Sequence, residues 1–65
     1  MKQTKAKDLK KGDIFCKALK VQNRVSYKVL RPLKDNVLEV VNRNTGENET
    51  MIINENKYLI YLRNE

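Results

Sequence analysis

The side chains with the clearest chemical potential in this chain are its lysines and arginines. Fourteen of the 65 residues are Lys or Arg against eight Asp or Glu, which gives a formal net charge of +6. Residues 1–34 contain eleven of these basic residues and only Asp8 and Asp13 as acids. This asymmetry predicts a basic face and a mildly acidic face, unless strand pairing mixes the two halves. A basic face suits an anionic partner.

Enzyme chemistry has little support in the composition. The chain has no His, one Cys and two Gly, so it lacks a histidine base and a glycine-rich phosphate loop. Cys16 lies in an apolar run, where a buried thiol is the expected role. The acids are scattered along the second half. We therefore expect no catalytic residue, no metal site and no cofactor, with a site shared between copies of the chain as the alternative.

Apolar residues with period two predict an all-β fold. They recur in five short runs, which are residues 14–19, 25–30, 37–41, 50–53 and 58–62. Turn signals separate the runs at residues 34–36 and 44–46, and the second of these predicts a positive φ at Gly46. The spacing predicts a small five-stranded antiparallel barrel over residues 8–65, with Leu9 closing one end. Residues 1–7 are expected to form a flexible basic tail.

The basic residues cluster around the first expected hairpin. If its two strands pair, Lys17 and Lys28 are expected to share the outer face. The resulting stripe would follow a phosphate backbone and bind DNA or RNA with little sequence preference. Its expected members are Lys10, Lys11, Lys17, Lys20, Arg24, Lys28, Arg31 and Lys34. The alternative is a solvated face on which Glu39 pairs with Lys28. Base stacking would additionally need Phe15 or Tyr61 on the surface.

The apolar residues beyond those a small barrel needs suggest a second function. They could contact a partner protein, or an exposed strand edge could do so. The expected partner-binding residues are Leu30, Val37, Val41, Leu59 and Tyr61. A basic rim would then steer the encounter with an acidic protein surface. In this alternative the protein is a small binding module or inhibitor, and a homodimer would use the same surface.

Three segments resemble small Src-homology-3-like or Tudor-like barrels. They are residues 8–15 (DLKKGDIF), 27–30 (YKVL) and 40–47 (VVNRNTGE), within a resemblance that spans residues 8–62. The chain is similar to the amino-terminal barrel of elongation factor P and to KOW-type modules, in which a Lys-Gly-Asp turn begins the first strand. The resemblance implies a Src-homology-3-like barrel. The glycines of the first hairpin and the lysine-bearing loop of elongation factor P are missing, so we expect no role in translation.

Composition also bears on location. The richness in lysine and asparagine resembles that of small accessory proteins of bacteria, phages or mobile elements, which often block a host protein. No apolar run approaches the roughly 18 residues of a membrane span. A single Cys fits a reducing compartment. We therefore expect a cytoplasmic protein without a membrane partner.

Overall fold

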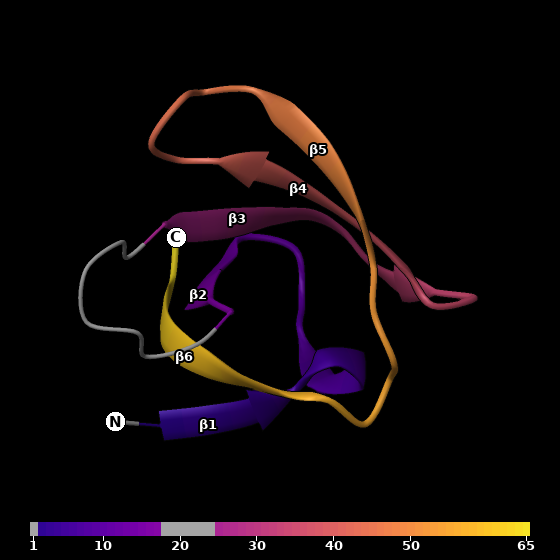
Figure 1. Cartoon of the computed structure of the whole chain (residues 1–65). Coiled ribbons are helices and arrows are strands. Elements are labelled where there is room, and N and C mark those ends of the chain that lie inside the picture. Colours follow the sequence, from indigo (N-terminus) through magenta and orange to yellow (C-terminus); the bar gives the residue numbers. More distant parts are fainter. Residues whose placement is uncertain (1, 18–24) are drawn as a thin grey trace.

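The computed structural model describes residues 2–17 and 25–65. They form one antiparallel sheet of six strands in the order β1-β6-β2-β3-β4-β5. The sheet curls strongly, with its edge strands β1 and β5 on opposite sides of the molecule (Figure 1). Its elements are β1 (Lys2–Lys5), the 3-10 turn η1 (Ala6–Asp8), β2 (Asp13–Cys16), β3 (Ser26–Lys34), β4 (Val37–Asn42), β5 (Asn48–Ile52) and β6 (Tyr58–Asn64).

The sheet has two free edges, β1 and β5, and is not a closed barrel. It also has one strand more than expected, because residues 2–5 pair with β6 where a flexible tail was expected. Ala6 fixes the end of this strand: its side chain is fully buried, and its N–H donates to the Lys57 carbonyl at 2.9 Å. The basic N-terminal segment is therefore part of the sheet.

The turns follow from residues that tolerate positive φ. Asp35 and Asn36 have φ of 53° and 63° and form the two-residue link between β3 and β4. Such a link suits the right-handed twist of a hairpin. Gly46 has φ of 79°, which confirms the sequence prediction. Gly12 has φ of 90°, and its N–H donates to the Val29 carbonyl at 2.9 Å. These turns therefore determine where β2 begins and how β3, β4 and β5 are connected.

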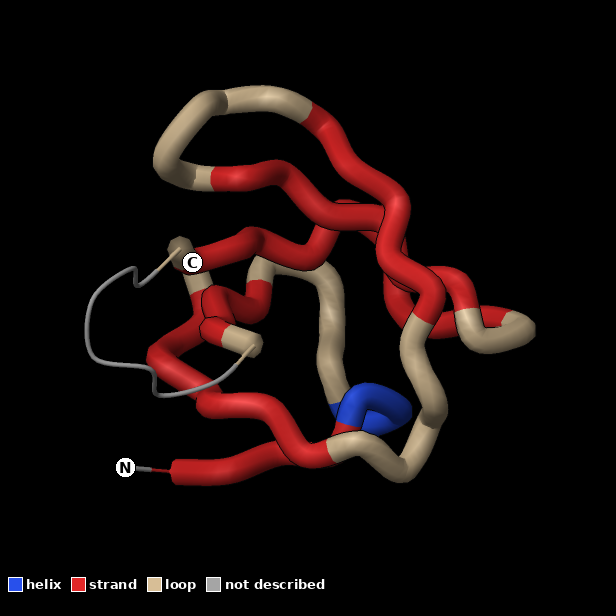
Figure 2. The backbone as a smooth tube through the Cα atoms, in the orientation of Figure 1, coloured by secondary structure: helices blue, strands red, loops and turns tan. Residues whose placement is uncertain are grey.

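The core lies on the inner face of the sheet. Its fully buried strand residues are Phe15, Val29, Leu38, Val40 and Leu59. Phe15 and Tyr27 stack with ring centroids 5.6 Å apart. Leu9 is 2% exposed and joins this cluster, as expected for a side chain that closes one end. Figure 2 shows η1 beside the loop between β5 and β6, where the Lys7 N–H donates to the Glu55 carbonyl at 3.0 Å. No helix among the described residues has the length and hydropathy needed to cross a membrane.

Candidate functional site

The structure separates Lys17 from Lys28, the two members of the predicted basic stripe that were expected to share the outer face. β2 and β3 pair Ile14 with Lys28 and Phe15 with Tyr27. Lys28 therefore lies on the outer face. Lys17 follows Phe15 by two residues, and its Nζ lies 5.4 Å from the centroid of the inward-facing Tyr27 ring. The prediction that Lys17 and Lys28 share the outer face is wrong.

The other described members of the stripe lie on β3 and in the segment that leads into β2. Arg31, not Lys28, pairs with Glu39 at 3.7 Å. Lys34 is exposed beside the β3–β4 turn, and Lys11 is exposed beside Gly12. Lys20 and Arg24 lie outside the described residues. Lys10 is the one described member of the stripe that lines the pocket beside β1 and β6.

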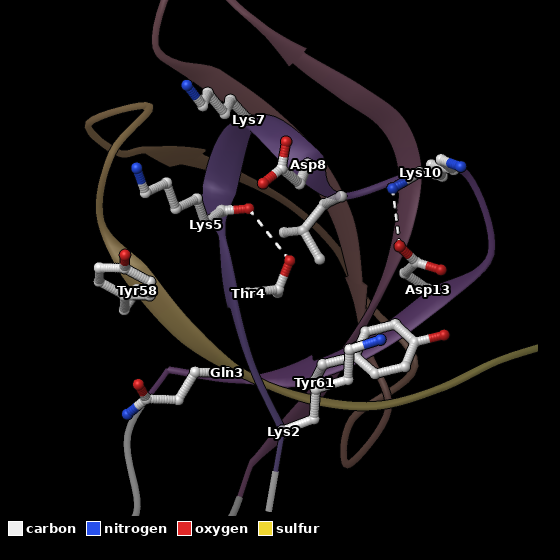
Figure 3. Close-up of a pocket in the computed structure, with 11 residues that line it drawn as sticks. Lys2, Gln3, Thr4, Lys5, Lys7, Asp8, Lys10, Asp13, Tyr58 and Tyr61 are labelled. Carbon is white, nitrogen blue, oxygen red and sulfur yellow. Dashed lines mark hydrogen bonds between the residues drawn. The ribbon is translucent and has the colours of Figure 1, made fainter.

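This pocket, called the lysine pocket below, lies where β1, η1 and the segment leading into β2 meet β6 (Figure 3). It is an open depression of about 990 Å³. Its charged and aromatic lining residues are Lys2, Lys5, Lys7, Lys10, Asp8, Asp13, Tyr58 and Tyr61. Four lysines and two aspartates thus line a surface that also presents two phenol rings.

The pairing of β1 with β6 places lysines beside tyrosines. Lys2 lies opposite Tyr61 and Lys5 opposite Tyr58 in the register. Directly opposed residues of antiparallel strands hold their side chains in contact. The Nζ of Lys2 is 5.2 Å from the Tyr61 centroid, and that of Lys5 is 5.7 Å from the Tyr58 centroid. These distances allow cation–π attraction. Tyr58 is nevertheless 57% exposed, so much of its surface is available to a ligand.

Asp13 holds the opposite wall of the lysine pocket. Its side chain is 6% exposed, and its Oδ2 accepts the backbone N–H of Lys10 at 2.8 Å. Its Oδ1 accepts the side-chain amide of Asn64 at 2.8 Å. Both carboxylate oxygens are thus occupied by internal hydrogen bonds, which satisfy a buried charge. Asp13 therefore has a structural role in fixing the chain at Lys10.

The lysines of the pocket have no acidic partner. Across residues 2–17 and 25–65, the three ion pairs all use arginine and join Arg31 to Glu39 and both Arg43 and Arg63 to Glu65. Asp8, the exposed acid of the pocket, forms none of them. None of the four ammonium groups therefore has a carboxylate of the described residues within ion-pair distance. Within the same residues, no three His, Cys, Asp or Glu side chains gather closely enough to hold a metal ion.

Sequence reasoning missed most of this pocket. Lys2, Lys5 and Lys7 belong to the segment that was expected to be a tail, and Tyr58 was not singled out. The available signal was the pair of small and apolar residues Ala6 and Leu9, both of which are buried. Their spacing of three residues marks a turn that packs on the core.

The predicted partner-binding residues differ in how much of each side chain is exposed. Leu59 is 1% exposed and packs in the core, so it offers no side chain to a partner. Tyr61 is half-buried in the lysine pocket. Leu30 and Val41 are half-buried, and Val37 is 37% exposed.

Comparison with protein-family models, curated proteins and solved structures gives no significant match. The resemblance to Src-homology-3-like modules stays a prediction, and the functional argument depends on the site.

Proposed function

We propose that the protein is a non-catalytic nucleic-acid-binding module that holds a single strand in the lysine pocket. The observation that carries this proposal is the combination of four lysines without carboxylate partners and two partly exposed tyrosines. Proteins that bind single strands without sequence preference combine a positive groove with aromatic rings on which bases stack. The lysine pocket offers both features within one depression.

The arrangement of the lysines favours contacts to the phosphate backbone. In Figure 3 the amines of Lys5 and Lys7 extend on one side of the pocket, and the amine of Lys10 extends on the opposite side. A strand crossing between them would place phosphates near both groups and a base near the Tyr58 ring. Contacts of this kind go to phosphates and ring faces, which carry little sequence information. The expected binding is therefore weakly sequence-specific.

A relationship of the fold to Src-homology-3-like barrels is also part of the proposal. The positions of β2 to β6 support a relationship to Src-homology-3-like barrels in which β1 is an added edge strand. Cytoplasmic location is also part of the proposal, and it is supported by the single, buried Cys16.

The direct test is fluorescence anisotropy with labelled 15-nucleotide DNA and RNA, single-stranded and duplex, at near-physiological salt. The variant Lys2→Glu/Lys5→Glu changes two residues of the pocket. The control Lys11→Glu/Lys34→Glu makes the same charge change at two exposed residues outside it. We expect saturable binding that prefers single strands, and a loss of at least tenfold in the pocket variant alone. Absence of binding by the native protein, or an equal loss in both variants, would overturn the assignment.

A further inference from the structure

The free edge of β5 presents unpaired backbone groups. β5 pairs with β4, and no described strand lies on its other side. The Ile53 N–H donates to the Asn36 carbonyl and the Asn42 N–H to the Glu47 carbonyl, both at 2.8 Å. In an antiparallel pair, every second residue directs its N–H and C=O groups away from the neighbouring strand. Since Glu47 and Ile53 bond to the β4 side, the outward groups belong to the even-numbered residues between them. Those residues are Asn48, Thr50 and Ile52, all of which are exposed.

A groove of about 530 Å³ runs beside this edge. Met51 and Ile53 line it and are only 7% and 9% exposed, so its floor is apolar. Ile52 is 86% exposed, the highest value among the large apolar side chains of the described residues. The rest of the lining includes Lys17 and Lys57. The groove therefore combines an open strand edge, an apolar floor and two cations.

The charges of the groove favour an acidic occupant. Neither Lys17 nor Lys57 takes part in any ion pair found in the described part of the chain. Glu49, the acid of the groove, already accepts a hydrogen bond from the Asn42 side-chain amide at 2.9 Å. The net charge of +6 on the whole chain also attracts an acidic partner over longer distances.

We propose that an extended, acidic segment of a partner protein adds to the free edge of β5 as a seventh strand. Strand addition obtains its affinity from main-chain hydrogen bonds and its specificity from pockets for alternate side chains. Apolar side chains of the added segment would lie on Met51 and Ile53. Acidic side chains at the ends of the added segment would lie near Lys17 and Lys57. This function uses a different surface from the lysine pocket.

A second copy of the chain is a less suitable occupant. Its own free edge at β1 carries Lys2 and Lys5, which would approach Lys17 and Lys57 with like charge. Two copies also repel each other through a net charge of +6 each. Self-association is therefore treated as an outcome that would contradict the proposal.

The test uses a labelled ten-residue peptide of alternating valine and aspartate, with alternating valine and lysine as the matched probe. Anisotropy measures affinity, and amide hydrogen exchange followed by NMR locates the binding site. We expect the acidic peptide to bind at least tenfold more tightly. The amides of Thr50 and Ile52, which we expect to exchange rapidly in the free protein, should become protected.

Two kinds of variant complete the experiment. Lys17→Glu/Lys57→Glu should weaken acidic-peptide binding at least tenfold, whereas Lys11→Glu/Lys34→Glu should not. Thr50→Pro removes an outward N–H that β4 does not use, so it should abolish binding in a folded protein. If Thr50→Pro does not fold, the lysine variants still decide. Equal binding of both peptides, protection confined to the lysine pocket, or a dimer by sedimentation would overturn the proposal.

Discussion

The salt dependence of binding tests the lysine pocket quantitatively. Each phosphate neutralised on a single strand contributes about −0.7 to the slope of log K against log salt. The four lysines of the pocket therefore predict a slope near −2.8 if each contacts a phosphate. Between 50 and 200 mM salt, such a slope corresponds to an affinity loss of about fiftyfold. A ligand held by stacking alone would show almost no loss.

Variants in which a neutral glutamine replaces lysine measure how many of the pocket lysines contact phosphates. Lys2→Gln/Lys5→Gln leaves two pocket lysines, so its slope should fall to about −1.4 and its loss over the same salt range to about sevenfold. Tyr58→Leu should weaken binding by about 1–3 kcal/mol through lost stacking, with an unchanged slope. The assay is anisotropy with a labelled oligothymidine at four KCl concentrations. A slope for the native protein shallower than about −1, or an equal slope in the double variant, would refute the reasoning.

Four further predictions concern stability. Gly12→Ala should lower the free energy of unfolding by about 1–3 kcal/mol or more, because φ is 90° and the new Cβ would lie 2.7 Å from the Glu65 carbonyl oxygen. Gly46→Ala meets no atom within 4 Å and should cost less in the same urea titration. Asp13→Ala should cost about 1–3 kcal/mol, because it leaves buried donors unpaired; a smaller change would show that water replaces the carboxylate.

The hydrogen bond from Arg63 is the main cause that lowers the pKa of Glu65 below its ordinary value of 4.5. Its stabilising contribution is therefore complete above that value and is lost as the pH falls through the lower folded-state pKa. Glu65→Gln should reduce the decline of Tm between pH 5 and 3, and an unchanged decline would contradict this role.

The turns and most strands could be predicted because local chemistry determines them. Gly46 tolerates a positive φ, and runs rich in Val, Ile and Tyr fit a pleated surface. β1 could not be predicted in this way, because Lys2–Lys5 contains no large apolar residue. Its pairing depends on tertiary contacts, namely the burial of Ala6 and the two tyrosines opposite Lys2 and Lys5. A segment without an apolar pattern gives no periodic signal for a strand.

The predicted position of Lys17 on the same face as Lys28 is wrong for a different reason. All four residues of β2 are buried, so buried side chains lie on both faces of this strand. Its sequence therefore has no alternation of apolar and polar residues that would identify the inner face. Because side chains alternate between the two faces, a wrong choice of inner face for β2 also reverses the expected face of Lys17. Phe15 lies opposite Tyr27 and shares the inner face with it, which brings Lys17 to the Tyr27 ring. Lys28 consequently lies on the other face, and a sequence pattern alone cannot make that choice.

The two free edges of the sheet have opposite capacities for pairing. Lysines on an edge strand oppose the addition of another strand, because pairing would bring their charges against a second chain. β1 has this protection in Lys2 and Lys5, and the same ammonium groups are the ones available to phosphates. β5 has no lysine, and it exposes Ile52 beside outward backbone groups. The two proposed functions, an anion at β1 and an added strand at β5, therefore use separate edges of one open sheet, and we expect a mutation at either edge to leave the other function unchanged.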